Sequence, residues 1–152
     1  MRIRDSLLLL ATLTAVACGG DGGTSPTGPA NVAGTWSFEA HGLTTAGSDV
    51  KCGITGSLQM AQEGTLVSGS YIIDRITCTS PAGTEVLPGP WGGSIVNGTV
   101  EGNTVHFHFD TDDVDQHGTV SGNRISGTCT WRYEVDGGGY LTLTGNWSAT
   151  RT

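Results

Sequence analysis

Apolar and polar residues alternate one by one along most of the chain after residue 31. This period of two is typical of β-strands with one buried face, and no apolar stripe at helical spacing occurs in this part of the sequence. Glycine-containing pairs separate the alternating runs, as expected for strands joined by tight turns. The pattern predicts eight strands, at residues 32–40, 52–62, 65–75, 92–100, 104–110, 116–120, 124–133 and 140–151.

The phrase Gly-Thr-Val-x-Gly-Asn occurs twice, 20 residues apart, at 98–103 and 118–123. Gly-Asn tolerates positive φ and therefore favours a two-residue hairpin turn. If both pairs are turns, the valine of the first phrase faces Val105, and that of the second faces Ile125. Pairing Val105 with Val120 then aligns four apolar residues in one row across four antiparallel strands, as a single buried face requires.

Glycine is predicted opposite a large side chain in several strand pairs. A turn at Glu63-Gly64 sets Gly56 opposite Tyr71, and pairing the last two strands sets Gly127 opposite Trp147. Small residues facing large ones fill a curved interior, and glycine allows a strand to bend sharply. We therefore predict an all-β fold, an eight-stranded antiparallel up-and-down barrel in which the last strand pairs with the first.

Two basic residues near the start of the chain precede an apolar run from Leu7 to Ala17. The run is too short to span a bilayer and is typical of the core of a secretory signal. The segment Ala15-Val16-Ala17-Cys18 resembles the lipobox of bacterial lipoproteins, which are cut before a cysteine that carries the lipid. The resemblance implies a lipoprotein signal peptide at 1–17 and lipidation of Cys18. Ordinary signal cleavage, with Cys18 removed or left as an idle thiol, is the alternative.

Residues 18–31 contain two prolines and no apolar side chain able to pack, so we expect a flexible tether followed by a barrel domain at 32–152. Gly19 stands where an aspartate would retain a lipoprotein in the inner membrane, so the resemblance implies a bacterial cell-envelope protein anchored in the outer membrane.

Cleavage removes two basic residues and one acidic residue, which changes the net charge from −7 to −8. We expect no nucleic-acid partner, because this charge repels phosphate backbones.

Gly34-Thr35-Trp36 matches the Gly-x-Trp on the first strand of lipocalins and avidins, members of the calycin group of meander barrels. The stretch from Gly64 to Tyr71 is similar to an avidin strand, although the asparagine that avidins use for biotin has no counterpart after Trp36. The resemblance implies a non-catalytic, cup-shaped barrel that binds a small apolar molecule or an envelope component at its open end, near a predicted loop at 79–90. We expect ligand contacts from four aromatic residues: Trp36, Tyr71, Trp91 and Trp131.

The combination of Ala33-Gly34-Thr35-Trp36 with Cys52 and Cys78 also resembles bacterial inhibitors of secreted metalloproteases. That resemblance implies an alternative function, a protein-interaction or protease-inhibitor domain that acts through its loops or N-terminal segment. The sequence has no nucleophile elbow, phosphate loop or His-Glu-x-x-His motif, so we expect neither catalysis nor a cofactor. We also expect a monomer.

Three cysteines follow Cys18, and an oxidising compartment favours one disulfide among them. In the predicted register Cys52 faces Arg75, three residues short of Cys78. A bend or bulge at the strand end absorbs that difference, so we predict a Cys52–Cys78 disulfide. Cys129 is expected to point inward as a small, inert apolar residue.

Histidine and aspartate occupy the predicted outer face of two neighbouring strands. His106, His108 and Asp110 alternate with apolar residues, and the register above places His108 opposite His117 and Asp110 opposite Asp115. Imidazoles and carboxylates gathered on one surface can bind a transition metal, and the acidic loop tip also offers oxygen ligands. The alternative is a solvated polar surface without a metal.

Overall fold

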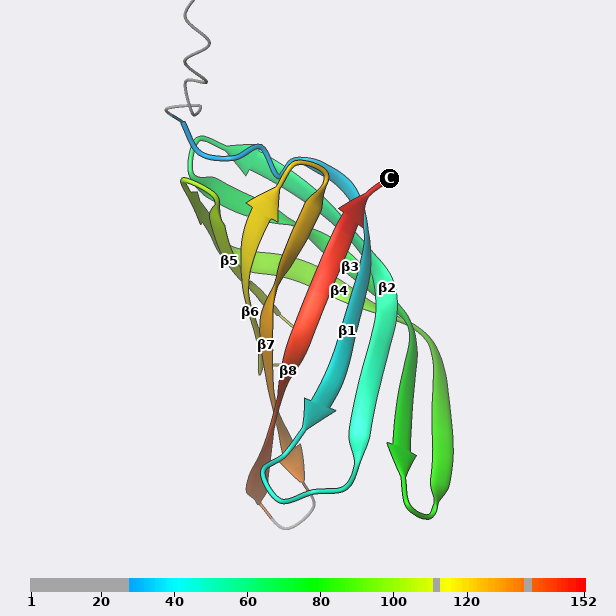
Figure 1. Cartoon of the computed structure of the whole chain (residues 1–152). Helices are drawn as coiled ribbons and strands as arrows, with labels where there is room; N and C mark the ends of the chain where they lie inside the picture. Colours follow the sequence, from blue (N-terminus) through cyan, green and yellow to red (C-terminus); the bar gives the residue numbers. More distant parts are fainter. Residues whose placement is uncertain (1–27, 111–112, 136–137) are drawn as a thin grey trace, which may run out of the picture.

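The computed structural model of the chain is a closed antiparallel barrel in which eight strands follow one another around the wall (Figure 1). This confirms the predicted fold class. The structure describes residues 28–110, 113–135 and 138–152. Within those ranges no helix has the length and apolar character needed to cross a membrane. The strands are β1 (Gly34–Thr44), β2 (Lys51–Glu63), β3 (Leu66–Ser80), β4 (Gly83–Glu101), β5 (Thr104–Phe109), β6 (Asp113–Ser121), β7 (Arg124–Val135) and β8 (Gly139–Arg151).

Both Gly-Asn pairs are turns, as predicted. Gly102 and Gly122 have φ values of 55° and 58°, a left-handed conformation that glycine adopts without steric cost. The pairs flanking these turns also match the prediction, since Val100 faces Val105 and Val120 faces Ile125. The inward residues of the strands form one continuous apolar core inside the barrel.

The predicted register between β2 and β3 is wrong by two residues. The turn lies at Gly64-Thr65, because Glu63 pairs with Leu66, and Gly56 consequently faces Ile73 rather than Tyr71. When a turn moves by one residue, each residue of one strand faces a partner two positions away from the predicted one. Because side chains alternate between the two faces of a strand, a shift of two residues keeps each side chain on the same face. The predicted inward residues therefore remain inward.

The register between β5 and β6 also differs from the prediction, because Val105 faces Gly118 and not Val120. At the end of β5, the Asp110 carboxylate accepts a hydrogen bond from the backbone N–H of Ser94 at 2.6 Å, and the Asp110 N–H donates to the Ser94 carbonyl at 3.1 Å. These bonds tie Asp110 to β4, and the last pair between β5 and β6 is Phe109 with Val114.

The loop predicted at 79–90 is instead a hairpin, in which β3 and β4 extend together to a turn between Ser80 and Gly83. Pairing of β4 with β5 begins only at Ile95, so the first part of β4 has a partner strand on one side. A free edge tolerates prolines, which lack the N–H that a second neighbour would need. Pro88 and Pro90 therefore lie within β4 and end no strand, contrary to the prediction, whereas Pro81 lies in the turn between β3 and β4.

The segment that precedes β1 is bound to one end of the barrel. The Ala30 N–H donates to the Gly102 carbonyl, and the Val32 N–H donates to the side-chain oxygen of Gln62, each at 2.7 Å. Ordered contacts thus begin two residues before the predicted domain start at Val32. The C-terminus lies at this same end, which we call the closed end (Figure 1). The β3–β4 turn lies at the opposite end, which we call the open end.

Candidate functional site

A cavity of about 230 Å³ occupies the half of the barrel interior nearer the open end. Its wall is formed by six strands, β1 to β3 and β5 to β7, together with Trp91 from the first half of β4. The cavity is lined by Phe38, Ile54, Tyr71, Ile73, Ile76, Trp91, Phe109, Val114, Gln116 and Trp131.

Stacked aromatic rings form the inner end of this cavity. The ring of Tyr71 lies nearly parallel to that of Phe109, with centroids 3.9 Å apart, and Phe38 meets Phe109 edge-on at 6.0 Å. These residues come from three strands and point inward because of the period-two alternation that the sequence shows. The arrangement presents a flat, apolar surface of the kind against which a ring or a short hydrocarbon chain packs well.

Gln116 is the polar group in this apolar wall, and it is only 1% exposed. Its side-chain N–H donates to the Sγ atom of Cys129 at 3.3 Å. Its Oε1 atom is buried and has no hydrogen-bond donor among the described residues. A buried acceptor without a partner is costly, so it usually marks a place where another molecule supplies the donor.

Sequence reasoning missed Gln116, although a signal was available. On β6 the inward positions carry Val114, Gln116, Gly118 and Val120, so glutamine interrupts an otherwise apolar face. A polar residue at a core position is the informative exception in an alternating pattern.

The predicted aromatic contacts are confirmed as cavity residues in three cases of four. Tyr71, Trp91 and Trp131 line the cavity, whereas Trp36 does not. Trp36 is fully buried at the closed end, where its indole N–H donates to the Val32 carbonyl at 2.9 Å. The Arg151 guanidinium covers its ring at 4.4 Å, which seals that end of the barrel. Trp36 therefore has a structural position at the closed end, away from the cavity.

A second cavity of about 480 Å³ adjoins the first on the side of the open end. Ile76 and Trp131 belong to the walls of both cavities, so the two are neighbours. The outer cavity also contacts the Cys52–Cys78 disulfide. Apolar side chains that are 39% to 57% exposed surround this end: Val50, Val86, Leu87, Trp91, Tyr140 and Leu141.

The predicted disulfide is present. Cys52 and Cys78 face each other directly across β2 and β3, with Cα atoms 4.1 Å apart. Of the three residues by which the predicted register fell short, two come from the shifted β2–β3 turn and one from a bulge at Asp74, where Thr55 pairs with Arg75 and Gly56 with Ile73. Cys129 points inward beside Gly145 and is 1% exposed, also as predicted. Burial raises the pKa of the Cys129 thiol to about 11, so it stays protonated at neutral pH.

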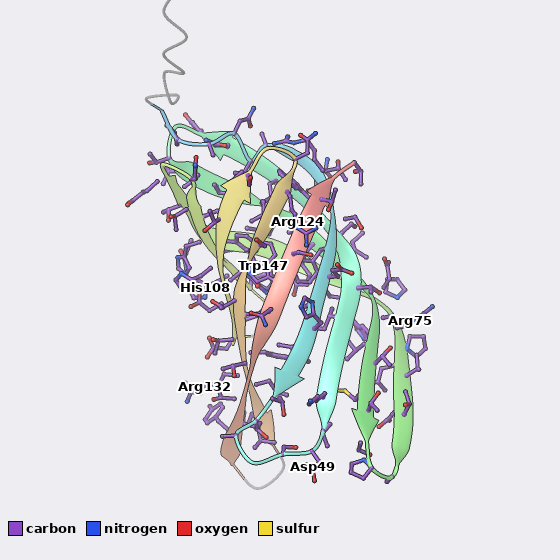
Figure 2. The ribbon with its side chains drawn as sticks, in the orientation of Figure 1. Asp49, Arg75, His108, Arg124, Arg132 and Trp147 are labelled. Atoms are coloured by element: carbon purple, nitrogen blue, oxygen red, sulfur yellow. A yellow bond between two sulfur atoms is a disulfide. The ribbon has the colours of Figure 1, made fainter. Side chains whose placement is uncertain are left out.

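Four of the five predicted metal-ligating residues converge on the outer face of β5 and β6. The Nε2 atom of His106 lies 2.5 Å from Oδ1 of Asp115, and that of His108 lies 3.4 Å from the same oxygen. The Nε2 atom of His117 lies 3.0 Å from the other carboxylate oxygen. Asp110, the fifth, does not lie with them, because its carboxylate accepts a hydrogen bond from the backbone of β4. Figure 2 labels His108 on the outside of the barrel.

Electrostatics keep the central carboxylate ionised. Partial burial by itself raises the pKa of Asp115, but the hydrogen bond from His106 and the charges of the surrounding imidazoles outweigh that effect. The net result is a pKa below the ordinary value of 3.8. The residues at 111 and 112, which belong to the predicted acidic loop tip, lie outside the described residues, as does Cys18.

These observations define the class of protein as a small, closed meander barrel with a half-open apolar cavity at one end. No family model matches the chain, and comparisons with curated proteins and with solved structures find no match.

Proposed function

We propose that the chain is a lipid-anchored envelope protein, with a calycin-like, non-catalytic barrel that binds a small, mostly apolar molecule in the inner cavity. The observation that carries this proposal is Gln116 Oε1, a buried acceptor without a donor in a wall that is otherwise apolar. Ligand sites in proteins combine apolar walls with a few polar groups of this kind. The proposed ligand accordingly carries a hydroxyl or N–H group on an apolar body.

Cavity size restricts the ligand further. Most small-molecule sites measure roughly 300 to 1,000 Å³, so the inner cavity, at about 230 Å³, is below that range. A dry cavity of about 150 Å³ is sufficient for benzene. One substituted ring or a short branched chain therefore fits inside, and a longer substituent would extend into the outer cavity.

The position of the anchor is compatible with access to the cavity. The segment at 28–33 reaches the barrel at the closed end, and the cavity opens at the other end. If Cys18 carries lipid, the segment that leads to the lipid joins the barrel at the end opposite the mouth of the cavity.

The test compares phenol with toluene, two single-ring probes of similar size that differ in one hydrogen-bond donor. Titration of the purified chain is followed by the NMR signals of the Trp91 and Trp131 indoles. A neutral hydrogen bond contributes about 0.5 to 1.5 kcal/mol, so the ratio of phenol to toluene affinity should fall roughly 2- to 12-fold in Gln116→Leu. An unchanged ratio would contradict the role of Gln116, and no binding of either probe would contradict the site.

A cavity-filling variant provides a matched control. Ile76→Trp places a large side chain in the wall shared by both cavities and should abolish binding of both probes. Leu66→Trp makes the same chemical change at a residue that is 63% exposed and outside both cavities, so binding should be unchanged. Loss of binding in both variants would indicate a general effect on the barrel rather than a site.

The alternative, a protein-interaction or inhibitor domain, is favoured by one specific observation. The first part of β4 has a free edge, and Val86, Leu87 and Trp91 are 42% to 50% exposed there. Exposed strand edges with apolar side chains often pair with a partner chain. Inhibition of a secreted metalloprotease that is lost in Val86→Lys would support this function. Absence of inhibition across a panel of such proteases would remove it.

A further inference from the structure

Three histidines and one aspartate form a compact group outside the barrel, on the opposite side of the β5–β6 wall from the apolar core. His106 faces His117 directly across the two strands, and His108 faces Asp115. The four side chains are between 30% and 57% exposed, so an ion in solution reaches them. This group is independent of the inner cavity and of the proposed ligand.

The imidazole rings are packed against one another. His106 stacks on His117 with ring centroids 4.2 Å apart, and His108 meets His106 edge-on at 4.9 Å. All three rings turn Nε2 toward the same carboxylate. The three Nε2 atoms therefore converge on one small region beside the carboxylate.

We propose that His106, His108, His117 and Asp115 bind a divalent first-row transition metal ion of the Zn²⁺ type. Three nitrogen donors and one carboxylate oxygen are a typical ligand set for such ions. Calcium and magnesium ions prefer oxygen ligands, so this set excludes them as the main occupants.

The distances agree with His106, His117 and Asp115 around one ion, and His108 lies beside the same carboxylate as a fourth donor. Zn–N and Zn–O bonds of about 2.1 Å in a tetrahedral site separate the donor atoms by about 3.4 Å. His108 already lies 3.4 Å from Oδ1 of Asp115, and His117 lies 3.0 Å from Oδ2. The donor atoms of His106, Asp115 and His117 all lie within 4.8 Å of one another. Binding requires mainly that His106 moves about 1 Å away from the carboxylate, which a small side-chain rotation achieves.

The experiment titrates ZnCl₂ into the purified chain by isothermal calorimetry in a buffer that does not chelate metals. Cys18→Ser is introduced throughout, so that the thiol near the N-terminus contributes no ligand. We expect one Zn²⁺ per chain, and a loss of affinity of at least about tenfold in His106→Ala or His117→Ala. His41→Ala is the matched control, because His41 is exposed on β1 and outside the cluster. Its affinity should equal that of the parent chain.

Two further measurements show whether the variants are still folded and how many ligands the bound ion has. Because His117 is 57% exposed, its replacement should leave the core intact, which circular dichroism verifies. Bound Co²⁺ reports coordination directly, since a four-coordinate site absorbs visible light more strongly than a six-coordinate one. Absence of Zn²⁺ binding at millimolar concentration would overturn the proposal. Equal binding by the parent chain and the cluster variants, or equal affinity for Ca²⁺, would overturn it as well.

Discussion

Gln116 shows how much a single side chain can contribute to the function of a barrel whose interior is otherwise apolar. Its side-chain N–H donates to Cys129, but its Oε1 atom is buried without a donor among the described residues. An apolar residue of similar volume would fill the same space at lower cost. The chain thus carries a destabilising group at the position where a ligand would supply the missing hydrogen-bond donor. Proteins often have such a loss of stability at a functional site.

The first prediction follows from that cost. Gln116→Leu should raise the free energy of unfolding by about 1 kcal/mol, because it removes a buried acceptor that has no partner. Chemical denaturation of the two chains without ligand measures the difference. A decrease in stability would mean that an unobserved donor satisfies the glutamine.

Cys129 provides a prediction for alkaline pH. Its folded-state pKa of about 11 exceeds the ordinary value of 9.0, so above pH 9 the unfolded chain loses the thiol proton while the folded chain keeps it. The unfolded state then binds fewer protons, and stability falls as pH rises. Denaturation curves between pH 8 and pH 10.5 should therefore show a smaller loss of stability in Cys129→Ala than in the parent chain. Parallel losses in both chains would contradict the pKa shift.

Single residues also show what sequence alone could predict. The inward and outward faces follow from alternation, so Val105, Phe107 and Cys129 were placed inside and the histidines outside correctly. Trp36 was placed inside, but its position at the closed end was not predicted. Its contact with Arg151 joins residues far apart in the sequence, and no local pattern indicates which end of a barrel such a contact closes.

At the scale of elements, pairs in three hairpins were predicted correctly. Gly102 and Gly122 adopt positive φ and the pairs beside them were correct, as was the pairing of Gly127 with Trp147 between β7 and β8. The predicted turn at Gly64 was one residue too early, and the sequence between β5 and β6 has no glycine to mark the turn. Both errors were shifts of two residues. They preserved the faces but changed which histidine faces which partner, so the cluster was predicted with one wrong member.

A prediction about strand packing concerns Gly127 on β7. A Cβ atom at this position would lie 1.8 Å from the His117 carbonyl oxygen on β6, so alanine forces the two strands apart. Gly127→Ala should lower the free energy of unfolding by about 3 kcal/mol, as severe overpacking does. In Gly53→Ala, the added atom meets its nearest neighbour, the Ala40 carbonyl oxygen, at 3.4 Å. That control should change stability by less than about 0.5 kcal/mol, and equal effects on both variants would contradict the packing argument.

At the scale of the whole molecule, the two ends of the barrel have different chemistry. The closed end is sealed by the segment at 28–33 and by Arg151 over Trp36, whereas the open end exposes apolar side chains around the outer cavity. The alternation of apolar and polar residues predicted the barrel itself, but it did not predict that its two ends differ. The extended β3–β4 hairpin, which the prolines concealed in the sequence, creates much of the open end.

The proposed anchor leads to a prediction about location. Cys18→Ser removes the residue that would carry the lipid, so the protein should move from the membrane fraction to the soluble fraction of a bacterial cell envelope. Fractionation measures the change, and mass spectrometry of the mature N-terminus identifies the lipid. The control is Ser25→Ala, which changes the same segment but not the proposed lipid site and should leave the protein in the membrane fraction. A soluble parent protein would contradict the anchor.

Trp147 connects the interior of the barrel with the histidine cluster. Its ring fills the space above Gly118, and its indole N–H donates to the carbonyl of His117 at 3.0 Å. The emission of an indole is sensitive to paramagnetic ions at short range. Cu²⁺ held by the histidines would therefore quench fluorescence that originates inside the core, and the protein would carry its own optical sensor for events on its outer wall.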